Sequence, residues 1–257
     1  SIAVELGLSA TAQISLNDAA VRSLAGVASG QITMPTNFWG KSNGPSTGIY
    51  YAGAANNGST LYSTITRLNA CGALIGCQTT AGTARWRLGG GSAGSNGIFY
   101  GGTVGGLLGT CQNNTVTRIN SSGALVGSQG AIGTARRFVA GAKVGSNAMF
   151  YGGVSGSNTR YNTATRINTC GSLVGSETSV GSARERVGAG LATTNGIYYG
   201  GYNGSNVQTT TRINACGASA GAETNISPAA QASAGANIGS NAVFFGGYTC
   251  SCLLYTS

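Results

Sequence analysis

The stretch Ile98-Phe99-Tyr100-Gly101-Gly102 is an apolar run closed by a glycine pair, and the chain repeats it. Further copies stand at residues 149–153, 197–201 and 243–247, and a weaker first copy stands at residues 49–53. The copies end at Gly53, Gly102, Gly153, Gly201 and Gly247. These glycines are 46 to 51 residues apart. That spacing is close to the length of one four-stranded β-propeller blade, about 40–50 residues.

Three further elements recur in the repeats. A Thr-Arg-(Leu/Ile)-Asn motif contains Arg67, Arg118, Arg166 and Arg212. A Gly-(Ala/Ser)-Leu-(Ile/Val)-Gly motif starts at Gly72, Gly123 and Gly171, and it has decayed at Gly217. A lone arginine precedes each Gly/Ala-rich run, at Arg85, Arg136 and Arg184, with Ala230 at the equivalent place. Each repeat therefore holds four short apolar or β-branched runs separated by turn residues, which predicts four short strands.

The composition favours a folded β protein. Glycine accounts for 45 of the 257 residues and only 7% are charged, but 41% are hydrophobic, which is too many for a disordered linker. Helical periodicity is missing from the repeats. The predicted fold class is all-β. We expect a propeller of about four to five four-stranded blades, complete or incomplete, behind a short helix-containing segment.

The repeats resemble kelch repeats, in which a hydrophobic strand ends at a glycine pair, a polar strand follows, and an arginine stands before the next unit. The resemblance covers about residues 49–247. It departs from the kelch pattern at the later strand, because Trp39 and Trp86 are the only tryptophans and neither recurs. The resemblance implies a kelch-like propeller over residues 45–251. Residues 1–44 then form a separate assembly or attachment segment.

The N-terminal segment is similar to a segment of virion and tail proteins of tailed bacteriophages. The similarity runs from Ile14-Ser15-Leu16-Asn17-Asp18 to Gly40-Lys41-Ser42, and residues 15–24 read as a short helix capped by Ser15 or Asn17. It implies a tail or tail-fibre associated protein, made in the host cytoplasm and located in the virion with other virion proteins. The alternative is a soluble bacterial carbohydrate-binding lectin domain of kelch type.

Both ends of the chain suggest a fragment of an environmental sequence. The chain starts at Ser1, and the fifth glycine pair has no two further strands behind it. The last six residues, 252–257, resemble a translated sequencing adaptor. The alternative is a natural apolar terminal strand. The full number of blades is therefore left open.

Length differences between the repeats fall in one loop per repeat, between the glycine pair and the next Thr-Arg motif. Equivalent loops of a propeller emerge on one face, so these loops are candidates for binding a host-surface glycan or lipopolysaccharide. Asparagine and tyrosine suit hydrogen bonding and stacking against sugars, but they are also ordinary turn residues. The candidate ligand-binding residues are Asn56, Asn57, Tyr62, Asn113, Asn114, Asn158, Arg160, Tyr161, Tyr202, Asn203 and Asn206.

The sequence gives no indication of an enzyme. Histidine is absent, which removes the commonest general base and metal ligand. The acids are Glu5, Asp18, Glu177, Glu185 and Glu223. Glu177 and Glu223 occupy equivalent positions in separate repeats, so we do not expect them to form a catalytic carboxylate pair. We expect no cofactor, no metal, no membrane span and no nucleic acid partner, and the sequence does not indicate an oligomeric state.

The net charge of +9 comes mainly from twelve arginines, most of them at repeated positions. With so few carboxylates, the arginines of the Thr-Arg motif are expected to bind loop carbonyls between blades. The alternative is a positive ring that faces an anionic ligand. Cys71, Cys170 and Cys216 share one repeat position with Ser122, which indicates small buried packing residues rather than disulfides.

Overall fold

A computed structural model describes residues 19, 21–22, 47–55, 58–69, 71–105 and 111–249. The chain divides into two compact units, residues 1–48 with 68–73, and residues 49–67 with 74–257. In the first unit, Ala19, Val21 and Arg22 are helical, and the proposed caps Ser15 and Asn17 lie outside the described residues. Residues 252–257 lie outside them as well.

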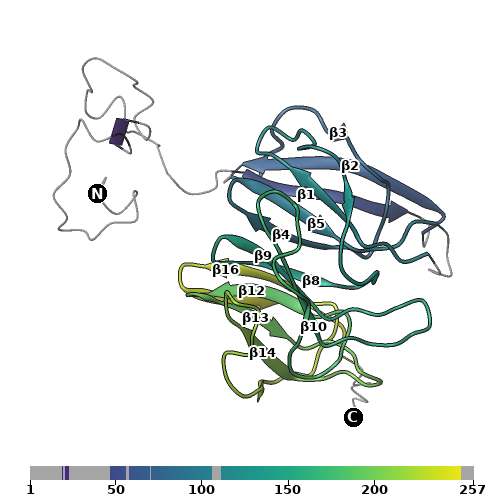
Figure 1. The fold of residues 1–257 in the computed structure, drawn as a ribbon, viewed down its shortest axis with the longest axis vertical. Coiled ribbons are helices and arrows are strands. Elements are labelled where there is room, and N and C mark those ends of the chain that lie inside the picture. The colour runs from purple at the N-terminus through teal and green to yellow at the C-terminus, as the bar shows by residue number, and fades with distance from the viewer. Residues whose placement is uncertain are drawn as a thin grey trace, which may run out of the picture. The chain divides into compact units, whose positions relative to one another are not determined.

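The described part of the chain is all-β, as predicted, and consists of antiparallel sheets that follow one another along the sequence (Figure 1). Three sheets have four strands each, in sequence order. One three-stranded sheet precedes them and one two-stranded sheet follows. The strands are β1 (Thr47–Ala55), β2 (Thr60–Asn69) and β3 (Thr79–Thr80); β4 (Gly89–Ala93), β5 (Asn96–Tyr100), β6 (Thr115–Ile119) and β7 (Gly130–Ala131); β8 (Ala140–Val144), β9 (Asn147–Tyr151), β10 (Thr163–Ile167) and β11 (Thr178–Ser179); β12 (Gly188–Ala192), β13 (Asn195–Tyr199), β14 (Thr209–Ile213) and β15 (Thr224–Asn225); β16 (Ala234–Ile238) and β17 (Asn241–Phe245).

The first strands of neighbouring sheets pack directly on one another, β4 on β8, β8 on β12 and β12 on β16. These strands are rich in glycine and alanine because their backbones come very close together. A Cβ atom on Gly141 would lie 2.4 Å from the carbonyl oxygen of Gly90, and one on Gly235 would lie 2.2 Å from that of Ala189. Any larger residue would push the sheets apart.

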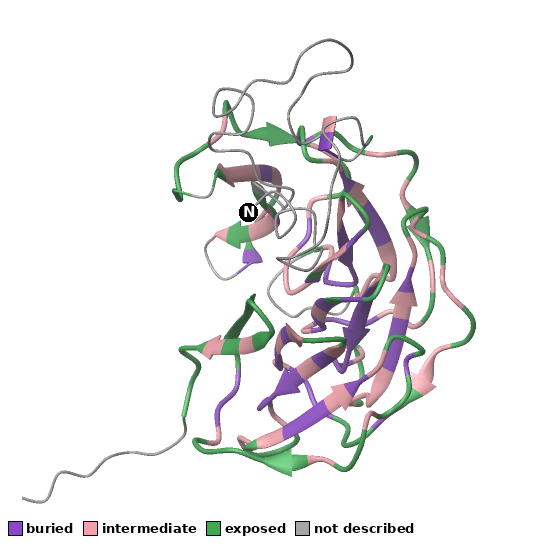
Figure 2. Cartoon of the chain, turned by 90° about the vertical axis from the view of Figure 1, so that its left-hand side faces the viewer, coloured by how far each residue is buried: buried purple, intermediate pink, exposed green. Residues whose placement is uncertain are grey.

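Strands β1, β5, β9, β13 and β17 carry large side chains that fill the space between sheets. Aromatic rings meet across each junction, with centroids 5.1 to 5.3 Å apart, in the pairs Tyr51–Phe99, Tyr100–Phe150, Tyr151–Tyr198 and Tyr199–Phe244. Figure 2 shows the buried residues concentrated on the strands and many exposed residues on the turns. The hydrophobic core is therefore a series of three layers, one at each junction between the first four sheets.

The repeated glycine pairs follow β5, β9, β13 and β17, and the pairs after β5, β9 and β13 are hydrogen-bonded to the segment that leads into the next sheet. Gly101 and Gly102 have φ angles of 75° and 98°, and a Cβ atom on Gly101 would lie 2.6 Å from the carbonyl oxygen of Arg136. The amide of Gly102 donates to that same carbonyl at 2.9 Å. Gly153 makes the equivalent bond to Arg184. The pair is therefore glycine because the backbone turns with positive φ against the arginine segment of the following sheet.

Candidate functional site

The lone arginines that precede the Gly/Ala-rich runs are fully buried between the sheets. Each lies over a tyrosine ring of the preceding sheet, with the guanidinium carbon 5.5 to 5.8 Å from the ring centroid. Each also binds a threonine hydroxyl of its own sheet, and that threonine binds a Gln or Glu. We call each set an inter-sheet staple; the three sets are Tyr51–Arg85–Thr117–Gln129, Tyr100–Arg136–Thr165–Glu177 and Tyr151–Arg184–Thr211–Glu223.

The staples satisfy buried backbone groups as well as side chains. Arg136 Nη1 donates to the carbonyls of Gly152 at 2.7 Å and Thr163 at 2.9 Å, and Nη2 lies 3.3 Å from Glu177 Oε1. Glu177 in turn accepts from the amide and hydroxyl of Thr134, at 3.0 and 2.6 Å. Two carbonyls, one hydroxyl and one carboxylate of its own sheet, with the Tyr100 ring of the preceding sheet, thus surround the Arg136 guanidinium, which gives these arginines a structural role.

The first staple lacks a carboxylate, because Gln129 stands where the others have glutamate. Burial lowers the pKa of Arg85 to about 10, against a smaller opposing contribution from Tyr51. In the third staple, burial raises the pKa of Glu223. Hydrogen bonds from Ser182 and Thr211, together with Arg184, outweigh burial and hold that pKa below its ordinary value.

The arginines of the Thr-Arg motif occupy one register position on β2, β6, β10 and β14 and are partly exposed. Arg67 Nη1 donates to the carbonyl of Ser121 at 3.4 Å, and Arg118 Nη1 donates to that of Thr169 at 3.3 Å. Both acceptors belong to a turn of the following sheet. These two arginines therefore link neighbouring sheets at the surface, and none of the four forms an ion pair with a described carboxylate.

The variable loops lie against the segments that follow the buried arginines. Single β-bridges join Arg137 to Val154 and Val154 to Arg160, and they join Glu185 to Tyr202 and Tyr202 to Asn206. The same arrangement joins Trp86 to Thr103 and Thr103 to Gln112. Each variable loop thus extends one end of its sheet.

The candidate residues of these loops fall into several groups. Three of them contact charged side chains of neighbouring segments. Asn158 accepts a hydrogen bond from Arg137, Arg160 pairs with Glu185, and the Tyr202 ring lies under Arg160 and Arg186. Asn113, Asn114, Asn203 and Asn206 form hydrogen bonds with loop backbone, which gives them a structural role. Tyr161 contributes backbone hydrogen bonds, Tyr62 lies elsewhere on β2 beside Tyr50, and Asn56 and Asn57 lie outside the described residues.

Arginine and aromatic side chains alternate across this loop face. The guanidinium carbon of Arg87 lies 3.6 Å from the ring centroid of Trp86 and 4.7 Å from that of Phe138. Arg186 lies 4.7 Å from the Phe138 ring and 5.7 Å from the Tyr202 ring, and Arg160 covers Tyr202 at 4.8 Å. We call this set, Trp86, Arg87, Phe138, Arg186, Tyr202 and Arg160, the arginine–aromatic ladder.

The ladder rests on backbone that repeats from sheet to sheet. Arg87, Phe138, Arg186 and Ala232 each stand two residues after a staple position, and all have φ angles of 56° or 57°. Their amides and carbonyls are linked in series: Phe138 donates to Arg87, Arg186 to Phe138 and Ala232 to Arg186, at 2.7, 3.2 and 2.7 Å. Left-handed backbone at non-glycine residues is uncommon and costs energy, and it is concentrated at functional sites.

Positive charge predominates in the ladder. Three of its six residues are arginines, and two of these, Arg160 and Arg186, share one carboxylate, that of Glu185. Glu185 lies 3.4 Å from Arg160 and 4.0 Å from Arg186, and it forms no ion pair with Arg87. Burial, and then repulsion by Arg137 and Arg186, lower the pKa of Arg87, although Glu185 opposes the change.

The sequence predictions missed Arg87, Phe138 and Arg186. Their repeat position holds arginine, phenylalanine, arginine and alanine in successive repeats, so no residue type recurs there. The sequence signal for two of them is their spacing, since Arg87 and Arg186 each stand two residues after a repeated arginine. The repeat pattern instead indicates the Thr-Arg motif as the alternative site for an anion.

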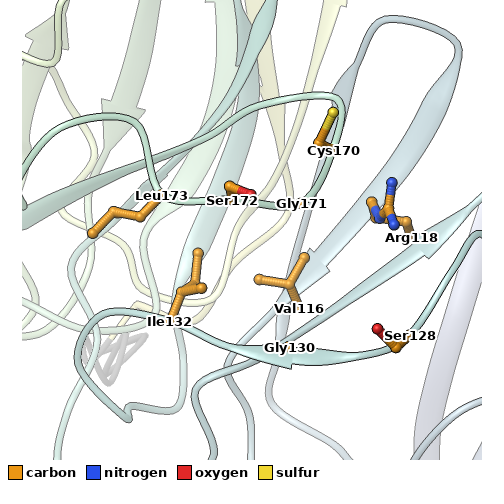
Figure 3. A pocket seen from close by; sticks show the side chains of 9 residues that line it. All are labelled: Val116, Arg118, Ser128, Gly130, Ile132, Cys170, Gly171, Ser172 and Leu173. Atoms are coloured by element: carbon orange, nitrogen blue, oxygen red, sulfur yellow. The ribbon is translucent and has the colours of Figure 1, made fainter.

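A hollow of about 250 Å³ lies between two neighbouring sheets. Figure 3 shows its lining residues Val116, Ile132, Leu173, Arg118 and Cys170, which come from β6, from the residue after β7 and from a turn of the next sheet. Arg118 donates to the carbonyl of Thr169 at this place. The hollow therefore offers a ligand one arginine, whereas the ladder contains three.

The prediction that the repeated cysteines are buried is wrong, because Cys71, Cys170 and Cys216 are exposed. Each lies in a tight turn held by an asparagine. Asn168 Oδ1, for example, accepts from the amides of Cys170 at 2.9 Å and Ser172 at 3.0 Å. Serine replaces cysteine in one repeat because the site faces solvent.

No protein-family model matches the chain, and no curated protein sequence is significantly similar to it. The described residues contain no group of three His, Cys, Asp or Glu side chains able to hold a metal ion. Within the same ranges, no helix has the length and hydrophobicity needed to cross a membrane. The arginine–aromatic ladder is the best candidate site in the described part of the chain.

Proposed function

We propose that the chain is a non-enzymatic virion protein of a bacteriophage, associated with the tail or tail fibre. In this proposal its sheets are kelch-like propeller blades, and the face that carries the variable loops binds a glycan of the host surface. The observation that carries the binding role is the arginine–aromatic ladder, where polar and aromatic side chains from three repeats meet variable loops. The virion setting rests on the resemblance of residues 14–42 to phage tail segments.

Several features of the face support a binding role. The loops that differ in length are the ones that reach it, whereas the rest of each repeat keeps a constant length. Asn158, Arg160 and Tyr202 are side chains of a kind that hydrogen-bond to or stack against sugars. A rigid array of sheets that positions variable loops is also the usual way in which binding surfaces are built.

The test is binding of the full chain to a glycan array and to host cells. The key variant replaces the four variable loops, each between a glycine pair and the next Thr-Arg motif, with short Gly-Ser turns. The matched control replaces Thr193-Thr194, in the turn between β12 and β13, with Gly-Ser. We expect the loop variant to lose binding and the control to keep it, while both keep the circular dichroism of a β protein.

Because shortened loops remove bridges to neighbouring segments, a milder variant is also needed. Asn158→Ala with Tyr202→Ala trims two side chains and leaves every loop at its full length. The function is refuted if the parent chain, correctly folded, binds neither glycans nor host cells. A virion scaffold would then remain, and immunogold labelling of assembled particles would test that role.

A further inference from the structure

We infer that the arginine–aromatic ladder binds an acidic polysaccharide, through the sulfate or carboxylate groups on its sugars. This inference rests on the proposed function, because it names the chemical class of the glycan. It places the anion site on the loop face, with Arg87, Arg160 and Arg186 as the groups that contact the ligand.

Stacking prepares the arginines of the ladder for this role. A guanidinium that lies over a ring keeps its charge and interacts with the π face of the ring. The guanidinium carbon of Arg87 lies over the rings of Trp86 and Phe138, and that of Arg186 lies over the rings of Phe138 and Tyr202. Such arginines lose little side-chain freedom when an oxyanion binds, and planar donor pairs suit sulfate and carboxylate oxygens.

Positive charge in the ladder exceeds negative charge within the described residues. Arg160 and Arg186 share one described carboxylate, that of Glu185, whose side chain is only 6% exposed, and Arg87 forms no ion pair with a described carboxylate. The side chains of Arg160 and Arg186 are 27% and 36% exposed, so solvent-borne anions reach them. An anion bound between them would relieve the repulsion among the guanidiniums.

The ligand extends over more than one sugar. The ladder takes residues from three successive sheets, and its backbone links run from Arg87 through Phe138 and Arg186 to Ala232. A row of arginines on backbone that repeats from sheet to sheet suits a polymer that carries one anion per sugar or per disaccharide. A single small anion would contact only one or two of the arginines and leave the rest of the ladder without a ligand.

The geometry favours a glycan over a nucleic acid. Proteins that bind single strands use bare aromatic faces on which the bases stack. Here guanidiniums cover the rings of Trp86 and Tyr202, and the Phe138 ring contacts Arg87 and Arg186. The rings therefore support the cations and are not platforms for bases.

The test measures binding of the full chain to dextran sulfate, to alginate, which carries carboxylates, and to uncharged dextran of the same length. We expect binding to the two acidic polymers alone, with affinity falling steeply between about 50 mM and about 500 mM salt. Arg87→Gln and Arg160→Gln should each weaken binding about tenfold. Lys143→Gln is the matched control. It removes the same charge from an exposed side chain on β8 and should change affinity less than about twofold.

Several results would overturn the inference. One is equal weakening by Lys143→Gln and Arg87→Gln, which would indicate attraction by net charge alone. Another is binding of a DNA duplex as tightly as dextran sulfate, which would replace the glycan with a general polyanion. If shortened loops abolish binding to host cells while the arginine variants bind normally, the proposed function stands and the ladder is only a packing device. Arg87→Lys, which keeps the charge and loses the planar donors, should fall between parent and Arg87→Gln.

Discussion

Replacing Arg136 with alanine tests whether the inter-sheet staples hold neighbouring sheets together. The substitution leaves the carbonyls of Gly152 and Thr163 without their donor and leaves Glu177, whose side chain is 16% exposed, without its counterion. Removing one partner of a buried pair costs about 3–5 kcal/mol. Water can enter the space left by a whole arginine side chain. We therefore expect a loss at the lower end of this range, about 3 kcal/mol in the free energy of unfolding.

The matched comparison is Arg85→Ala, which removes the same side chain from the staple that has Gln129 in place of glutamate. No carboxylate is left unpaired there, and the buried charge of Arg85 is itself unfavourable, so we expect a smaller loss of about 2 kcal/mol. Urea unfolding followed by circular dichroism gives both values, together with the slope that reports cooperativity. The reasoning is refuted if Arg136→Ala unfolds within about 1 kcal/mol of the parent chain, or if Arg85→Ala is the more damaging change.

Two further predictions concern the acidic positions of the staples. Gln129→Glu gives the first staple the carboxylate that Glu177 and Glu223 supply elsewhere, so it should raise the free energy of unfolding by about 1 kcal/mol in urea, and a decrease would contradict this reading. The pKa of Glu223 in the folded chain lies below its ordinary value of 4.5, so its stabilisation is present above pH 4.5 and is lost as the pH falls through the folded pKa. Glu223→Gln should therefore flatten the decline in stability below pH 4.5, and parallel curves for variant and parent would count against it.

Much of the β architecture could be predicted because it depends on features that repeat in the sequence. The glycine pairs follow the ends of β5, β9, β13 and β17, and the Thr-Arg motifs lie in β2, β6, β10 and β14. Strand identity is a local property, set by apolar runs and by glycines that must turn with positive φ. The closure of these sheets into a propeller is a global property, and it stays a prediction.

The candidate site was predicted only in part, for a physical reason. Asn158, Arg160 and Tyr202 belong to variable loops, so length differences pointed to them. Arg87 and Phe138 contact each other because their backbones are linked from sheet to sheet, and one-dimensional spacing does not show that contact. The prediction that the repeated cysteines are buried failed because the exchange of cysteine for serine between repeats is compatible with a small buried site and with an exposed turn.

Each inter-sheet staple is divided between two repeats, and this division affects how the gene can evolve. The tyrosine comes from one repeat, and the arginine, threonine and acid or amide come from the next. Tyr51, Tyr100 and Tyr151 are equivalent in this respect. A deletion of residues 103–153 would therefore bring Tyr100 to Arg184, and the new junction would have the same chemistry as the lost ones. Unequal recombination can lengthen or shorten such an array by whole repeats without requiring a compensating substitution.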